Sequence, residues 1–297
     1  MISFIDHYVE LCRTGVILND KGVKLKAGSI RSIISTQSAL KRYCSRRRIR
    51  LTFEKIDIEF YNDFVNFLTE ATHSRGRYKP NVIGKFIKGI KALLRYAHEN
   101  GYTNNDAYKR REFKVLKENV ETVYLTEEEL GRLKMLDLPG NRAQIRDSFL
   151  VSCYTGLRYS DISRLESKHV NYSTNMISII TQKTNTQVII PIHPIVCEIF
   201  ERYDKCPPKV QCNQATNRML KVLCRKAGIT DLITIMETRG GVREEKSYAK
   251  CDMVTTHTAR RSFATNAFKR GVPTLSIMQI TGHRTESSFM RSFQLQT

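Results

Sequence analysis

The chain has 297 residues, of which 41% are hydrophobic, and this length and composition suit two domains with ordinary buried cores. No apolar run is long enough to span a membrane and the N-terminus lacks the pattern of a signal peptide, so we expect a cytoplasmic protein. It carries 49 Lys and Arg against 29 Asp and Glu, a net charge of +20, with +12 up to residue 120 and +8 beyond it. An excess of this size in both halves predicts a polyanionic partner such as nucleic acid.

The eight cysteines do not suggest a metal site. No two of them have Cys-x-x-Cys spacing, and Cys206, Cys212 and Cys224 lie near one another without the spacing of zinc ligands. The sequence also lacks a cluster of carboxylates typical of a magnesium or calcium site. We therefore expect reduced thiols, no metal and no cofactor.

The first part of the chain is predicted to be helical. Residues 29–49 place apolar side chains at helical spacing, with Ser29 as a candidate N-cap and a basic cluster at the end. A clearer helix covers residues 81–101, with Asn81 as its candidate cap and Asn100-Gly101 as its end, and it carries a basic stripe. The cluster and the stripe are candidates for contacts with DNA phosphates, although a solvated face is an equal alternative for the stripe. These candidate DNA-binding residues are Arg46, Arg47, Arg48, Lys85, Lys88, Lys91 and Arg95.

A polar, charged stretch without periodicity separates this part from the rest. It runs to Leu125, and Thr126 with Glu129 then forms a capping box that begins a new helix. We therefore expect a helical domain over residues 1–115, a linker over 116–124 and a second domain over 125–297.

The second domain has a mixed pattern. A buried helix is predicted to end at Gly156, and Ser160 is a candidate cap for the next helix. Two β-rich runs surround a polar turn at residues 181–186, which predicts a hairpin. Residues 236–252 are predicted to be a loop or an extended arm, and further helices occupy the remainder.

Four short motifs carry the chemical information. They are "TGLRYSDISRL" with Arg158, the hairpin with Lys183, "THTARRSFAT" with His257 and Arg260, and "ITGHRTESSFMRSF" with His283. Each motif alone is weak, because a surface charge or a helix end explains it equally well. Their joint order strongly resembles the tyrosine recombinase family, also called phage integrases, and within it the integrases of mobile elements in Bacteroides-type bacteria.

The resemblance covers nearly the whole chain and implies a fold and a function. The fold is mainly α with a small β-sheet: a helical, SAM-like core-binding domain and a mixed catalytic domain that form a C-shaped clamp around duplex DNA. The function is site-specific recombination or integration of a mobile genetic element in a bacterial cytoplasm. DNA is cut and rejoined through a 3′-phosphotyrosyl intermediate, without metal or ATP. Four protomers are expected on two paired sites, and a monomer or weak oligomer without DNA.

The chemistry explains why these residue types occur together. The five-coordinate phosphorus of the transition state carries extra negative charge, and the rigid forks of Arg158 and Arg260 fit its oxygens. The resemblance assigns protonation of the leaving 5′-oxygen to Lys183. His257 would assist in deprotonating the nucleophile or hold the phosphate, and His283 would donate a hydrogen bond to a phosphate oxygen. Asp161 lies where the family has an acidic residue, and we interpret it as an orienting residue rather than a catalyst.

The nucleophile is missing. In the family a tyrosine lies nine residues after the Gly-His histidine, and here that position is Ser292. A phenol with a pKa near 10 is both a nucleophile and a leaving group, whereas an alkyl hydroxyl is harder to deprotonate and serine is too short. Three explanations remain: deliberate replacement to hold intact DNA, a natural defective recombinase, or a nucleophile from elsewhere such as Tyr248 or another subunit.

Two rival functions stay open. The chain could be a non-catalytic DNA-binding regulator or accessory protein descended from a recombinase, or, on charge alone, an RNA-binding protein. Many relatives carry an additional N-terminal arm-binding domain and a C-terminal tail, and we expect this chain to be a fragment without them.

Overall fold

The structure is a computed structural model that describes residues 1–73, 76–283 and 285–290. Contacts divide the chain into two compact units: Met1–Val120 with Met236–Glu245, and Glu121–Ile235 with Lys246–Thr297. The grouping of 236–245 with the first unit has no counterpart in the sequence-based domain division. Within the described residues no helix has the length and apolar character needed to cross a membrane.

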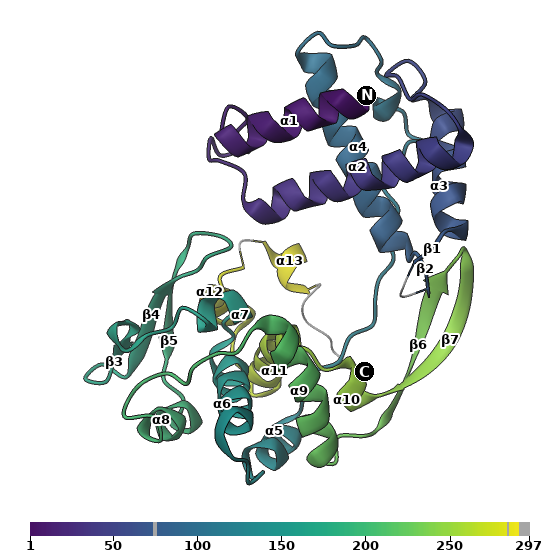
Figure 1. Cartoon of the computed structure of the whole chain (residues 1–297). Helices are drawn as coiled ribbons and strands as arrows, with labels where there is room; N and C mark the ends of the chain where they lie inside the picture. The colour runs from purple at the N-terminus through teal and green to yellow at the C-terminus, as the bar shows by residue number, and fades with distance from the viewer. Residues whose placement is uncertain (74–75, 284, 291–297) are drawn as a thin grey trace. The chain divides into compact units, whose positions relative to one another are not determined.

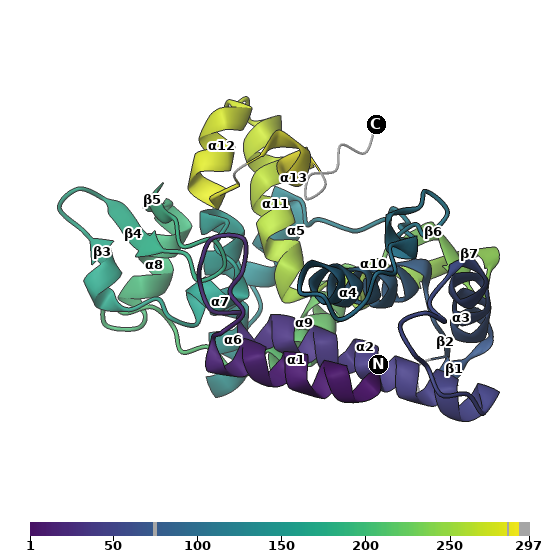
Figure 2. The same cartoon turned by 90° about the horizontal axis from the view of Figure 1, so that it is seen from above.

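Four helices form the first unit, and α1 lies beside α2 while α2 and α3 pack on α4 (Figures 1 and 2). Its core contains Leu40, Phe64 and Ile87, all fully buried. A short antiparallel hairpin and a 3-10 turn complete it. The elements are α1 (Ile2–Thr14), α2 (Ala27–Arg47), α3 (Ile58–Glu70), β1 (Thr72–His73), β2 (Gly76–Arg77), α4 (Pro80–Glu99) and η1 (Ala107–Lys109).

Two of the predicted helix starts in this unit are wrong. Helix α2 begins two residues before Ser29, and α4 has Lys79 as its N-cap and Pro80 in its first turn. Asn81 does not cap α4, because its side-chain amide bonds both the backbone N–H and the carbonyl of Glu118, at 3.0 and 2.8 Å. The amide therefore fastens the returning chain to α4, a long-range role that sequence spacing does not reveal. The predicted end of α4 at Asn100-Gly101 is confirmed.

The second unit is built around two central helices, α6 and α11, which pack on each other (Figure 1). Almost every side chain in the last three turns of α6 is buried, so this helix forms the middle of the core. The other helices surround this pair, and a small antiparallel sheet of order β3-β4-β5 lies at one side. The elements are α5 (Glu127–Lys134), α6 (Gly140–Thr155), α7 (Tyr159–Ile162), η2 (Ser167–His169), β3 (Val170–Asn171), β4 (Met176–Ile180), β5 (Gln187–Pro191), α8 (Pro194–Glu201), α9 (Asn213–Lys226), α10 (Lys250–Met253), α11 (Thr256–Lys269), α12 (Thr274–Thr281) and α13 (Glu286–Met290).

Several local predictions for this unit are confirmed. Thr126 and Glu129 form the capping box of α5, Gly156 ends α6 with φ 68°, and the turn of the β4–β5 hairpin occupies residues 181–186. Ser160 does not cap a helix, because α7 already begins at Tyr159 with Arg158 as its N-cap. The fold class, mainly α with a small β-sheet, is thus confirmed.

Residues 236–252, expected to be a loop or an arm, contribute to a second hairpin, β6 (Leu232–Arg239) and β7 (Val242–Ala249). The turn of this hairpin and the adjoining strand residues, Met236–Glu245, belong to the first unit. There the nearly buried carboxylate of Glu237 accepts a hydrogen bond from Lys79 Nζ at 2.7 Å. The arm interpretation is therefore the better of the two.

The last residues of the expected linker are held by the second unit. Val123 and Leu125 are buried. The backbone N–H of Leu125 donates to Ser262 Oγ at 2.8 Å, and its carbonyl accepts from Asn266 Nδ2 at 3.0 Å. Both partners lie on α11, so the incoming chain is attached directly to the helix that carries the His-x-x-Arg motif.

Candidate active site

Arg260 joins three elements of the second unit. It lies on the second turn of α11 and is buried, with Nη1 donating to the carbonyl of Gly156 at 2.8 Å and Nη2 donating to the carbonyl of Thr281. The first carbonyl is at the end of α6 and the second at the end of α12. A side chain at Gly156 would both require a strained positive φ and collide with Phe263, so glycine is needed where these elements meet.

Arg158 follows the same glycine turn and reaches the same region. Its Nη1 is buried and has no hydrogen-bond partner among the described residues. Burial lowers the pKa of the Arg158 guanidinium, and the charge of Asp161 partly offsets this. Burial likewise lowers the pKa of Arg260 to about 9, with a smaller contribution from the charge of Arg158. The two guanidinium groups therefore repel each other and require a nearby negative charge.

Asp161 supplies part of that charge and also positions a loop. It is completely buried on α7, and its Oδ1 accepts the backbone N–H of Gln182 at 2.7 Å. Its Oδ2 has no partner within the described part of the chain. The carboxylate favours the charged forms of Arg158 and Arg260, and its orienting role stays a prediction.

Lys183 comes next in the chain, in the turn between β4 and β5. The turn is closed by a hydrogen bond from Thr181 N to the carbonyl of Thr186 at 2.9 Å and by a 2.8 Å contact between the hydroxyls of Thr181 and Thr184. The Lys183 side chain is exposed, and its charge contributes to the lowered pKa values of both His257 and His283. The ammonium thus lies within electrostatic reach of the histidines.

Both histidines are held neutral. Desolvation by surrounding protein atoms and the charges of Arg261, Arg260, Arg158 and Lys183 lower the pKa of His257 to about 4, although its side chain retains solvent exposure. Desolvation and a similar set of cations lower the pKa of His283 to about 3. Neither ring therefore adds a positive charge near pH 7 in the absence of an anion.

The tautomer of His283 follows from its neighbour. The hydroxyl of Thr281 has one proton and donates it to the carbonyl of Ile277 at 2.6 Å. At 2.8 Å from His283 Nδ1 the same oxygen accepts when Nδ1 carries the ring proton, and Nε2, which is 3.2 Å from Arg260 Nη2, is then an acceptor. A neutral His283 has no proton left on Nε2, and donation from Nε2 to phosphate requires that the ring gain one.

Polar groups without partners are concentrated here. In the described part of the chain, five buried side-chain atoms lack a hydrogen bond, namely Arg158 Nη1, Asp161 Oδ2, Arg260 Nε, Arg261 Nε and Thr265 Oγ1. Buried polar groups are normally bonded, so such a cluster marks a place where a ligand completes the bonding. Three of the atoms belong to arginines, so an anion is the ligand that this region would favour.

The structure groups most of the predicted site residues. The charges of Arg158, Lys183 and Arg260 all lower the pKa values of His257 and His283, and the charge of Asp161 favours the charged forms of Arg158 and Arg260. Ser292 lies outside the described residues. Tyr248, considered as a substitute nucleophile, lies on β7 instead of in a loop.

Arg261 is not among the site residues expected from the sequence. It follows Arg260 directly in "HTARRSFAT", and its charge is the first of the neighbouring charges that lower the pKa of His257. Since α11 has 3.6 residues per turn, a cation four residues after His257 lies on the same face, and this spacing could have identified it.

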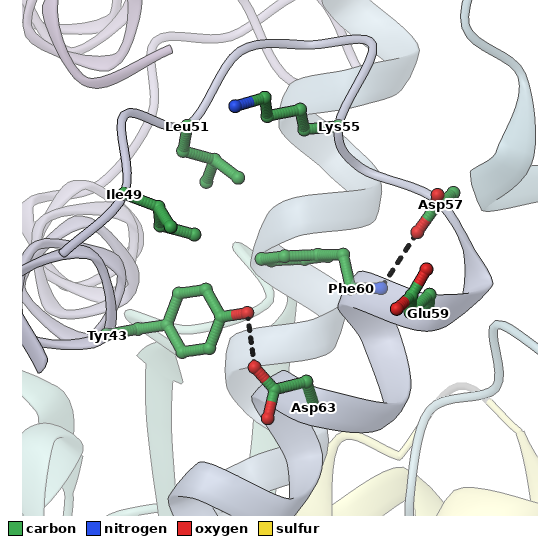
Figure 3. A pocket seen from close by; sticks show the side chains of 8 residues that line it. All are labelled: Tyr43, Ile49, Leu51, Lys55, Asp57, Glu59, Phe60 and Asp63. Carbon is green, nitrogen blue, oxygen red and sulfur yellow. Dashed lines mark hydrogen bonds between the residues drawn. The ribbon is translucent and has the colours of Figure 1, made fainter. Parts of the chain in front are cut away.

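The predicted DNA-binding residues of the first unit separate into two groups. Arg46 and Arg48 line a hollow of about 570 Å³ together with Lys41 and Arg42. Arg47 is directed elsewhere and forms an ion pair with Asp63. Asp63 also accepts from the hydroxyl of Tyr43 at 2.8 Å, in a second hollow whose carboxylates make it unsuitable for DNA (Figure 3).

The basic stripe on α4 is also divided. Lys85, Lys88 and Arg95 are exposed. Lys91 is only partly exposed, and its Nζ donates to the carbonyl of Phe113 at 2.8 Å while lying over the ring of the same residue. Lys91 therefore serves packing within the first unit rather than contact with a partner.

Comparison with known proteins gives a consistent result. A model of the phage integrase SAM-like domain matches residues 3–115, and a model of the phage integrase family matches residues 124–293. The chain is 22% identical over 225 residues to the tyrosine recombinase XerD of Listeria innocua serovar 6a, with 75% of this chain and 73% of that protein covered.

Solved structures share the fold at lower identity. Lambda integrase, in a dimer bound to a COC′ core site, is similar with a TM-score of 0.71 and 13% identity over 98% of this chain and 94% of that one. The integrase of the transposon Tn1549, in complex with circular intermediate DNA, gives 0.65 and 15% over 99% and 96%. On the match of both family models, the chain belongs to the phage integrase family of tyrosine recombinases.

Proposed function

We propose that this protein is a site-specific DNA recombinase or integrase of a mobile genetic element. The observation that carries the proposal is the group of buried, unpartnered guanidinium atoms of Arg158 and Arg260 beside two neutral histidines. The name of XerD, a tyrosine recombinase, supports the reaction class, and the complex of the Tn1549 integrase with circular intermediate DNA supports the mobile element.

The reaction would use the site as follows. A tyrosyl oxygen attacks phosphorus and forms the 3′-phosphotyrosyl bond, while the bond to the 5′-oxygen breaks and that oxygen receives a proton from Lys183. Arg158 and Arg260 stabilise the added negative charge on the non-bridging oxygens. His257 takes the proton of the tyrosine, which its low pKa permits because the ring is neutral beforehand. Rejoining reverses each step.

With serine at position 292 the chain itself would bind DNA without cleaving it. Serine places its oxygen several bonds closer to the backbone than tyrosine does, and an alkoxide is a poor leaving group for the return step. The same residue favours a second candidate function, a non-catalytic DNA-binding regulator or accessory protein descended from a recombinase.

The partner would be double-stranded DNA that carries a recombination site. Arg158 and Arg260 of the second unit would contact it, as would the hollow of the first unit that Arg46 and Arg48 line. Lambda integrase is solved as a dimer on one core site. If each of two recombining sites holds such a pair, the active assembly contains four protomers.

The test uses duplexes selected for binding from a random pool. Nicked duplexes of this sequence, labelled on the 3′-side phosphate, would be incubated with the parent chain and with Ser292→Tyr, then resolved on a denaturing gel. A covalent protein–DNA band with Ser292→Tyr alone supports the recombinase. A band with the parent chain would direct the search to Tyr248 or Ser292, and binding without any band would favour the regulator.

A further inference from the structure

Within the described residues, Arg261 has no ion pair and one of its buried nitrogen atoms has no hydrogen bond. It lies in the second turn of α11, one turn after His257, and is partly buried. Its Nε is inaccessible to solvent and has no hydrogen bond, and within the described residues its guanidinium makes no ion pair. Burying a charge in this way is unfavourable unless an opposite charge arrives.

Arg146, a buried arginine of the same unit, provides a comparison because its side chain is bonded within the protein. It is buried on α6, with Nε donating to Asp147 at 2.6 Å. Its Nη1 donates to the carbonyls of Lys134 and Leu136, at 2.7 and 2.8 Å. Arg146 is therefore fully compensated by its own protein, and Arg261 is not.

No carboxylate near Arg261 is found, among the described residues, to offset its positive charge. Its pKa is lowered by burial, with no carboxylate acting in the opposite direction. The residues one turn before and after it on the same face are His257, which is neutral, and Thr265, whose buried hydroxyl also lacks a partner. Among these residues this face of α11 thus holds one positive charge and no negative charge.

We propose that Arg261 binds a DNA backbone phosphate of its own, next to the phosphate held by the candidate active site. Successive residues on a helix are about 100° apart, so Arg261 is directed away from the Gly156 and Thr281 carbonyls that hold Arg260. The two arginines therefore bind different phosphates. A planar, always charged fork on the same face as His257 suits a phosphate beside the reacting one. The inference rests on the proposed function, because it requires DNA at this face.

The test measures the salt dependence of DNA binding. The probe is a 30-base-pair duplex of random sequence, and affinity is measured against NaCl concentration for the full chain, Arg261→Met and Arg261→Lys. Methionine keeps the packing of the side chain but removes the charge, so the slope of log affinity against log salt becomes smaller by about one. Lysine restores the charge and thus the slope.

The matched control is Arg270→Met at the end of the same helix. Arg270 is exposed and pairs with Glu127 at 3.1 Å, so this variant keeps the parent slope. An Arg261→Met slope equal to the parent's, at unchanged melting temperature, overturns the inference and leaves the proposed function intact. A slope lost in Arg261→Met and not restored in Arg261→Lys indicates a packing role and also overturns it. A parent chain that does not bind the duplex overturns both.

Discussion

The carboxylate of Asp161 accepts the backbone N–H of Gln182 at 2.7 Å, and this bond connects the arginine motif to the loop of Lys183. Asp161 lies on α7, three residues after Arg158, whereas Gln182 begins the turn of the β4–β5 hairpin. One buried side chain thereby connects the short helix that follows Arg158 to the turn that carries Lys183.

The first prediction concerns this bond. Asp161→Ala removes a hydrogen bond to a charged acceptor, and such a bond contributes about 1.5–3 kcal/mol to stability. Asp161→Asn keeps an acceptor oxygen and is expected to lose less. Urea unfolding of both variants measures the difference, and equal losses would show that the bond to Gln182 does not hold the loop.

The same variants can report on proton transfer in a chain carrying Ser292→Tyr. If Asp161 positions Lys183, Asp161→Ala slows cleavage of ordinary DNA. Replacing the bridging 5′-oxygen with sulfur restores the rate, because a thiolate leaves without a proton. Failure of the sulfur substrate to rescue either Asp161→Ala or Lys183→Ala would remove the acid role from this loop.

The second prediction separates the two arginines of the site. Arg158→Ala removes a guanidinium for which no hydrogen bond is described, and we expect little change in stability. Arg260→Ala removes donors to the carbonyls of Gly156 and Thr281 and is expected to cost about 3 kcal/mol. Both variants should lose at least about a hundredfold in cleavage when made with Ser292→Tyr. Thermal unfolding and the suicide-duplex assay together check this, and near-parent cleavage in either variant contradicts it.

The third prediction is uptake of protons when DNA binds. In the free protein the pKa values of His257 and His283 are about 4 and about 3, so both rings are neutral near pH 7. A phosphate beside His283 raises the pKa of that ring, whereas His257 stays neutral to act as the base, so the complex binds more protons than the free protein and affinity increases as the pH falls. Calorimetry in buffers of different ionisation enthalpy measures the uptake. His257→Asn with His283→Asn should abolish it, and uptake unchanged in that double variant would assign the protons elsewhere.

The fourth prediction has the opposite pH dependence. For both histidines the folded pKa lies below the ordinary value of 6.5, so the unfolded chain binds more protons between these values. The DNA-free protein therefore loses stability as the pH falls from 6.5 towards about 4. Urea unfolding across this range measures the loss, and the double asparagine variant should show a shallower dependence.

The fifth prediction divides the arginine cluster at the end of α2. Arg46→Ala and Arg48→Ala remove charges at the hollow and should each weaken duplex binding and reduce its salt slope. Arg47→Ala breaks the exposed pair with Asp63 instead and should leave the slope close to that of the parent. Equal slopes for all three variants would show that the cluster acts only through the overall charge.

Local signals in the sequence predicted the parts of the fold that depend on local chemistry. The capping box of Thr126 and Glu129, the stop at Gly156 and the turn at 181–186 each involve neighbours within a few residues. Asn81 was predicted incorrectly because its amide serves Glu118, 37 residues away, and no spacing rule anticipates that choice.

The candidate site likewise combines residues that the sequence indicates with residues whose roles depend on the folded structure. Residue types and order indicated Arg158, His257, Arg260 and His283, and the structure places their charges within reach of one another. The resemblance could not indicate Arg261. This residue is of interest because it lacks a partner among the described residues, and only the folded structure shows that. Similarly, Lys91 has the spacing of a phosphate contact but is used for packing on Phe113.

The mutual repulsion of Arg158 and Arg260 also affects the lifetime of the protein in the cell. A protomer without DNA keeps like charges side by side in a poorly hydrated place, and this strain works against its own folding. Occupancy by a phosphate turns the repulsion into shared attraction, so the substrate acts as a stabilising ligand. We therefore expect protomers without DNA to be less stable, and so more readily unfolded and degraded, than protomers that hold a phosphate at this site.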